Sequence, residues 1–184
     1  MEVLYYSKNV ISSLGMNATL TFLDLNLLNI RNEGACWIGK CLETNSTLTS
    51  INFMYNEIGY EGASAIAEGI KKNSTLTLIN LSSNNIGCKG ASSISEAFKT
   101  NSTIKSFNLS HNQIGDMGTC SIAETCKTNC TVTSIDLRYN EIGDVGATSI
   151  GEALTTNFFV TSIHLDHNNI RNNDVIFYFY HKFL

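Results

Sequence analysis

The sequence contains no proline, little charge and no long apolar run. Only 15% of its 184 residues are charged, and the formal net charge is −4 at pH 7. Such weak and scattered charge argues against a nucleic-acid-binding surface, and a hydrophobic content of 43% argues against disorder. No apolar run approaches the roughly 18 residues of a membrane-spanning helix, so we expect no membrane segment. The length suits one domain with a sizeable core.

The sequence also lacks a visible secretion signal, because its first residues, Met-Glu-Val-Leu-Tyr-Tyr, have no basic flank followed by a long apolar stretch. The six cysteines share no common pairing offset, so we predict free thiols and a cytoplasmic location. Cys126 and Cys130 would supply half a zinc site, but no second pair stands at metal-ligand spacing. No phosphate-binding loop, serine-nucleophile motif or metalloprotease motif occurs. We therefore expect no metal, no cofactor and no enzymatic activity.

What the chain does contain is a repeat. Asn-Ser-Thr or a related triplet begins a unit every 28 residues, at Asn17, Asn45, Asn73, Asn101, Asn129 and Asn157. Most of these triplets match the glycosylation pattern, but their period equals that of the repeat, so we expect a structural role. The chain is predicted to be one domain with a half-repeat or cap at 1–16, repeats at 17–44, 45–72, 73–100, 101–128 and 129–156, and a divergent repeat or cap at 157–184.

Each unit predicts one strand and one helix. In the second unit, Ile51 and Phe53 alternate with polar residues, which is the period of a short strand. Ile66 and Ile70 are four residues apart and give one apolar helix face. Gly62, at the helix start, is expected to let the helix pass close to the strand below. One unit cannot bury its own apolar face, but a stack of units can.

The ends of the helices carry further signals. Asp116 and Asp144 stand just before two helices and are predicted to be their N-caps. The opening asparagine of the following unit is predicted to take a left-handed conformation after the helix end. The first unit has Leu28 and Arg31 where other units have asparagine and glycine, so we expect an irregular turn there.

A second asparagine recurs in the turn that leaves each strand. There, the backbone groups point inward, away from water, and a buried amide can both donate to them and accept from them. We assign this role to Asn56, Asn84, Asn112, Asn140 and Asn168.

The pattern L-x-x-L-x-L-x-x-N-x-L with its I-G-x-x-G-A tail resembles leucine-rich repeats of the ribonuclease-inhibitor-like subclass over about nine-tenths of the chain. The resemblance implies an α/β solenoid, a right-handed horseshoe arc with a parallel β-sheet on its concave face and α-helices on its convex face. It makes the turn asparagines an asparagine ladder and implies a non-enzymatic scaffold that binds a protein. The subclass also occurs in nucleotide-binding innate immune receptors and Ran GTPase-activating proteins. A small-GTPase regulator and the recognition fragment of a larger receptor or effector are therefore the alternatives.

Strand alternation predicts which side chains face the concave side. The core uses residues such as Ile135 and Leu137, so the positions between them are free to vary, and polar variety at free positions is typical of a binding surface. Tyrosine and arginine commonly anchor interfaces. The predicted partner-binding residues are Tyr55, His111, Asp136, Arg138, Tyr139, His164, Asp166 and His167.

The last of these residues also bear on a metal site, because His164 and Asp166 share one face of a strand. We favour a polar, solvent-facing strand. The expected partner is a protein rather than nucleic acid or a membrane. We expect a monomer, with a dimer through the aromatic tail at 175–184 as the alternative; that tail is otherwise interpreted as a cap.

Overall fold

Short strands and helices alternate along residues 18–171, the part of the chain that the computed structural model describes. The predicted half-repeat at 1–16 and the aromatic tail at 175–184 lie outside the described residues. The elements are β1 (Phe22–Asp24), α2 (Arg31–Leu42), β2 (Ser50–Asn52), α3 (Tyr60–Lys72), β3 (Leu78–Asn80), α4 (Gly87–Thr100), β4 (Ser106–Asn108), α5 (Gly115–Thr128), β5 (Ser134–Asp136), α6 (Asp144–Thr156) and β6 (Ser162–His164).

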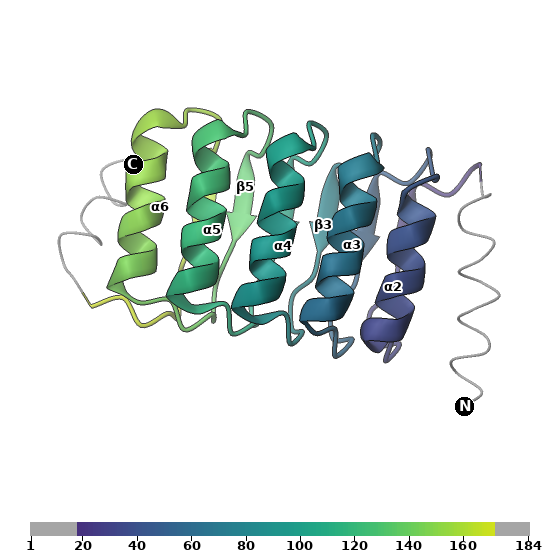
Figure 1. Cartoon of the computed structure of the whole chain (residues 1–184), viewed down its shortest axis with the longest axis horizontal. Helices are drawn as coiled ribbons and strands as arrows, with labels where there is room; N and C mark the ends of the chain where they lie inside the picture. Colours follow the sequence, from purple (N-terminus) through teal and green to yellow (C-terminus); the bar gives the residue numbers. More distant parts are fainter. Residues whose placement is uncertain (1–17, 172–184) are drawn as a thin grey trace.

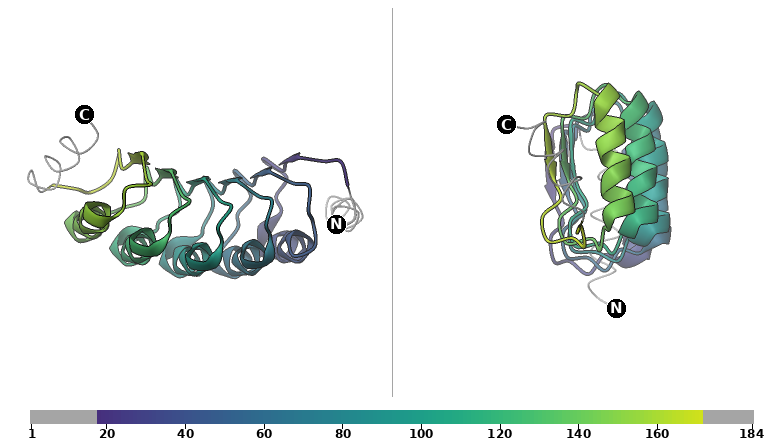
Figure 2. Two further views of the ribbon diagram at one scale, coloured as in Figure 1. Left: turned by 90° about the horizontal axis from the view of Figure 1, so that it is seen from above. Right: turned by 90° about the vertical axis from the view of Figure 1, so that its left-hand side faces the viewer.

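The strands form one parallel sheet in the order β1-β2-β3-β4-β5-β6. Each residue pairs with the residue 28 positions later, as Ile51 does with Ile79. The helices stand side by side in a single row in front of the sheet (Figure 1). Seen from above, the strands line the inner side of a shallow arc and the helices line its outer side (Figure 2). The predicted α/β solenoid, with strands concave and helices convex, is confirmed.

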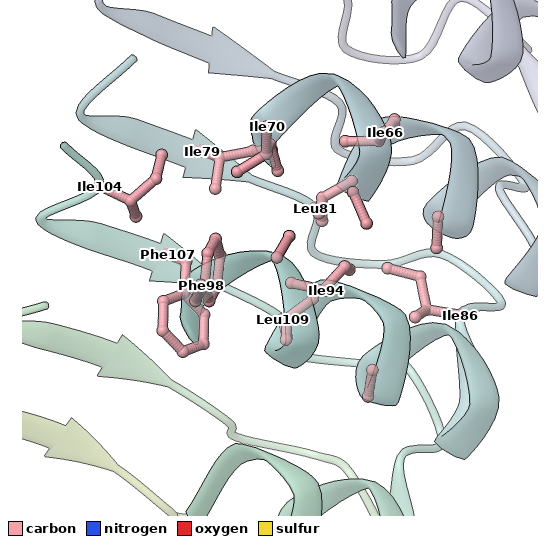
Figure 3. Close-up of a cluster of buried hydrophobic side chains, with 14 of the residues drawn as sticks. Ile66, Ile70, Ile79, Leu81, Ile86, Ile94, Phe98, Ile104, Phe107 and Leu109 are labelled. Atoms are coloured by element: carbon pink, nitrogen blue, oxygen red, sulfur yellow. The ribbon is translucent and has the colours of Figure 1, made fainter. Parts of the chain in front are cut away.

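The core lies between these two layers. Ile79 and Leu81 point inward from β3 and its exit, and Ile94 and Phe98 meet them from α4 (Figure 3). The Phe98 and Phe107 rings lie 4.8 Å apart between centroids. Every repeat thus buries its apolar face against the next one, which is why the alternation in the sequence was sufficient to predict the layers.

The repeat glycines at the helix starts permit close packing, but against a different neighbour from the one predicted. A Cβ added to Gly90 would lie 2.6 Å from the Ile86 Cγ2 atom and 3.0 Å from the Cβ of Ala63 in the preceding helix. The first distance is shorter than real Cβ contacts, and the second is tighter than most of them. Glycine here therefore lets adjacent helices, rather than helix and strand, approach one another.

Helix capping crosses from one repeat to the next. Asp116 lies inside α5 and its Oδ1 accepts hydrogen bonds from the backbone N–H groups of Gly143 and Gly146, both 2.8 Å away, at the start of α6. Asp144 likewise lies within α6 and accepts from the N–H of Arg171, at 2.7 Å. The prediction that these aspartates cap their own helices was wrong. Asp116 satisfies orphan N–H groups at the start of the following helix, and Asp144 bonds the equivalent turn of the last repeat.

The opening asparagines also differ from the prediction. Asn73 and Asn101 have φ of −74° and −75°, so they are extended rather than left-handed. Asn101 is buried, its Oδ1 accepts from the N–H groups of Thr103 and Ile104, and its Nδ2 donates to the carbonyls of Ile70 and Asn73. The same pattern recurs at Asn73, Asn129 and Asn157. These amides form a second buried asparagine ladder. In the folded chain, their side-chain nitrogens already donate hydrogen bonds to backbone carbonyls.

The turn of the first repeat is regular, contrary to expectation. Leu27 and Arg31 have φ of 60° and 55°, and the equivalent Ser83 and Gly87 have φ of 54° and 61°. Asn56, from the next repeat, accepts from the N–H of Leu28 through its Oδ1 atom, at 3.1 Å. The turn keeps its shape because the next repeat, rather than its own position 28, supplies the amide.

Candidate functional site

The turn that leaves each strand is held by the asparagine ladder. Nδ2 of Asn112 donates to the carbonyls of Leu81, Leu109 and Ser110 at 2.9–3.0 Å. Its Oδ1 accepts from the N–H of Ile86, in the preceding repeat, at 3.3 Å. Asn56, Asn84, Asn140 and Asn168 make equivalent bonds. The ladder fixes the backbone beside the concave face, and so fixes where the neighbouring surface side chains begin.

One column of concave residues contributes to the same turn. Oδ1 of Asn108 accepts a hydrogen bond from the N–H of Ser110 at 2.8 Å, and Oδ1 of Asp136 accepts from the N–H of Arg138 at 3.1 Å. Asp24, Asn52 and Asn80 do the same in their repeats. Such side-chain bonds to the backbone two residues on favour a turn. The prediction that the side chains at these positions do not contribute to the fold was wrong for this column.

Asp136 and Arg138 form an ion pair on the C-terminal half of the concave face. Nη2 of Arg138 lies 2.6 Å from Oδ2 of Asp136, and its Nε lies 3.0 Å from Oδ1. Burial by itself would raise the pKa of Asp136, but the hydrogen bonds and charge of Arg138 outweigh it and hold that pKa below its ordinary value. The same hydrogen bond and charge raise the pKa of Arg138, and Asp166 adds to this effect. The site therefore presents a fixed, partly neutralised cation.

Beside this pair, three rings stack along the arc. The rings of His111 and Tyr139 lie 4.1 Å apart between centroids at an interplanar angle of 12°, and those of Tyr139 and His167 lie 4.2 Å apart at 11°. All three residues have a left-handed backbone, with φ of 56° or 57°. The 28-residue spacing of these residues was visible in the sequence, but the rotamers that bring the rings face to face were not.

The remaining predicted residues are less closely joined to this group. The imidazole Nε2 of His164 lies 3.2 Å from the hydroxyl of Ser162, and Asp166 is exposed. Tyr55, which is 53% exposed, occupies the ring position of the second repeat. Ser83 stands between it and His111 in the column, so the structure does not bring Tyr55 into the stack.

Other chemistry is sparse in the described region. Residues 18–171 contain no group of three or more His, Cys, Asp or Glu side chains placed to share a metal ion. None of the helices described there has the length and apolar character needed to span a bilayer. The six cysteines are free thiols distributed along the stack, and burial raises the pKa of Cys126 to about 12.

Comparisons with known proteins agree with the repeat. The model of the family described as Leucine Rich repeat matches residues 44–67, 72–95, 100–119 and 128–151. The fold is similar to leiomodin-1 actin-binding site 2, with a TM-score of 0.72 and 19% identity over 79% of this chain and 84% of that one. It is also similar to the tropomodulin C-terminal domain of Caenorhabditis elegans, with a TM-score of 0.69 and 14% identity over 83% and 93% of the two chains. At these identities the likeness concerns the fold alone. No curated protein matches the sequence.

Proposed function

Because the chain belongs to the leucine-rich repeat family, we propose that it is a non-enzymatic scaffold that binds a protein partner on the C-terminal half of its concave face. The fold supplies a rigid, slightly curved surface on which side chains can change without disturbing the core. Function on such a fold is decided by the surface side chains rather than by the fold itself.

The observation that carries the proposal is the ring stack of His111, Tyr139 and His167 beside the Asp136–Arg138 pair. Stacking fixes the rings before a partner arrives, so less conformational entropy is lost on binding. Tyr139 is still 43% exposed, and tyrosine and arginine are frequent interface anchors. The equivalent centre of the face, at Ser82 and Ser83, offers no comparable anchor.

Actin is the first partner to test, because the leiomodin-1 domain is named as an actin-binding site. Binding of the purified chain to actin would be measured for the wild type and for Tyr139→Ser. If actin does not bind, affinity purification followed by mass spectrometry would identify a partner for the same comparison. We expect Tyr139→Ser to weaken binding at least about tenfold, as loss of an anchor typically does.

The matched control is Tyr60→Ser. Tyr60 is exposed to a similar extent, 48% against 43% for Tyr139, but it begins the convex helix α3. Both variants should therefore fold alike. Equal loss of binding in the two, or no loss from Tyr139→Ser, would contradict the assignment to the C-terminal half.

The proposal includes a cytoplasmic location, for which the free thiols are the support. The purified protein would be unfolded and alkylated without reductant. Its mass should then show that every cysteine is modified. Protection of a pair of cysteines, which reduction then releases, would contradict a reducing compartment.

A further inference from the structure

One column of turn residues repeats with the same backbone along the arc. Its φ values run from 54° to 60°, and its members are Leu27, Tyr55, Ser83, His111, Tyr139 and His167. From Leu27 to Tyr139, each N–H in the column donates to a carbonyl of the next repeat, as in the 2.9 Å bond from Ser83 to Ser110 and the 3.3 Å bond from Tyr55 to Ser82. The spacing of the column is therefore set by backbone hydrogen bonds rather than by the side chains.

This column begins with Leu27 and carries a ring at every later position except Ser83. The rings of His111, Tyr139 and His167 are stacked, with 4.1 and 4.2 Å between successive centroids, whereas Ser83 carries no ring. Tyr55 occupies the same position one repeat before Ser83. Parallel strands are about 4.8 Å apart, so Tyr55 and His111 stand roughly 9–10 Å apart along the arc. That separation is about twice the stacking distance observed in the same column. The gap above Ser83 thus has the thickness of one planar ring.

We infer that this gap is a slot that takes one aromatic side chain of a protein partner, between the faces of Tyr55 and His111. The inserted ring would complete a continuous five-ring column with a component that this chain does not supply. This inference rests on the proposed function and deepens it, because it names what the partner inserts and where. It also gives Tyr55, which lies apart from the three-ring stack, a place in the interface.

An aromatic ring suits the slot better than an arginine side chain. The turn segments around it, 54–57, 82–85 and 110–113, carry one acidic residue and no Lys or Arg. That residue, Glu57, is already paired with Arg31 at 3.0 Å. A guanidinium would lose its hydration here without gaining a free carboxylate, whereas an aromatic ring needs no counter-charge and gains stacking on both faces.

The slot can be tested with a free probe, N-acetyl-tryptophanamide. Its titration into the wild-type chain should shift the ring NMR signals of Tyr55 and His111 together and in a saturable way, because both would feel the ring current of the inserted indole. The absence of a saturable shift up to the solubility limit of the probe would overturn the inference. Tighter binding of N-acetyl-argininamide than of N-acetyl-tryptophanamide would overturn the aromatic assignment.

The decisive variant is Ser83→Tyr, which supplies the missing ring from within the chain. Tyrosine is already accommodated at this position in two other repeats, with φ of 54° at Tyr55 and 56° at Tyr139, so the variant should fold. It should abolish the probe-induced shift, whereas Tyr60→Ser, which removes an exposed ring from the convex helix α3, should leave it unchanged. Undiminished shifts in Ser83→Tyr would contradict the slot.

The same variants separate this inference from the proposed function. If Tyr139→Ser weakens the partner and Ser83→Tyr does not, the C-terminal site stands and the slot is refuted. If Ser83→Tyr blocks both probe and partner while Tyr139→Ser has no effect on the partner, the slot stands and the assignment to the C-terminal half is refuted.

Discussion

Adjacent residues in each turn follow opposite rules. Asn112 is fully buried and makes four hydrogen bonds to backbone groups, and every equivalent position from Asn56 to Asn168 is also asparagine. His111, one residue earlier, is exposed, and the equivalent positions carry Leu, Tyr, Ser or His. The difference teaches that the need to hydrogen-bond buried backbone groups determines the residue type at one position and leaves the adjacent position available for function.

A third position lies between these extremes. Asn108 and its equivalents face the concave side, yet each accepts a hydrogen bond from the backbone two residues on. In β6 this position becomes His164, which bonds the Ser162 hydroxyl instead. Exposure alone therefore does not identify a functional residue. Positions whose side chains make no hydrogen bond to the backbone, such as His111 and Tyr139, are the stronger candidates on geometric grounds.

The largest effect should come from Asn112→Ala. The change leaves the carbonyls of Leu81, Leu109 and Ser110 without the amide that satisfies them, and each buried polar group left unpaired costs about 1–3 kcal/mol. We expect a loss of roughly 3 kcal/mol in the free energy of unfolding, measured by chemical denaturation.

His111→Ser is the control for this comparison, because it changes the adjacent residue to one that Ser83 already provides at the same turn position. It removes one exposed stacking contact and should cost under about 1 kcal/mol. Equal losses for the two variants would show that the distinction between the two positions is false.

A smaller loss is expected from Arg138→Ser, about 1.5 kcal/mol at neutral pH, toward the low end for a charged hydrogen bond because the Arg138 side chain is 44% exposed. The pKa of Asp136 is lowered in the folded chain, so its contribution is present above the ordinary carboxyl pKa, near 4, and is lost as pH falls through the lowered value. The difference between wild type and variant should therefore begin to shrink below about pH 4 and disappear only below the lowered pKa of Asp136. A difference that is constant from pH 7 to pH 3 would rule out the ion pair as its cause.

The smallest effect is a gain in stability from Ser95→Ala. Ser95 is 2% exposed, and its hydroxyl has no hydrogen-bond partner among residues 18–171. It lines a cavity of about 10 Å³ beside Phe98 and Cys126, and the equivalent residues in adjacent repeats are Ala67 and Ala123. Removing an unsatisfied buried hydroxyl should raise the free energy of unfolding by about 1 kcal/mol. A loss of stability would indicate that an ordered water satisfies this hydroxyl.

The repeat architecture was predictable because it depends on periods that a sequence displays directly. Alternation at Ile51 and Phe53 gave the strand, the four-residue spacing of Ile66 and Ile70 gave the helix face, and the 28-residue period gave the parallel register. Each follows from burial of an apolar face, which side-chain type alone encodes.

Contacts between repeats were harder to foresee. The sequence suggests that Asp116 caps the helix that contains it, yet its carboxylate accepts from the N–H groups at the start of the following helix. The ring stack depends on rotamers at left-handed turn positions, which no spacing rule specifies. Both features arise from neighbours in the adjacent repeat, 27 to 30 residues away, and a search of each column for chemically related side chains was the available signal.

The proposed partner site lies on the concave face, and the chain carries natural reporters on both faces. His111 and His167 lie on the concave side, whereas Trp37, the single tryptophan, is 40% exposed on the convex helix α2. The most direct measurement is therefore NMR of these three side chains with and without the bound protein partner. The histidine ring signals should shift or broaden while the Trp37 indole signal stays in place. A shift of the Trp37 signal with unchanged histidine signals would contradict a concave binding site.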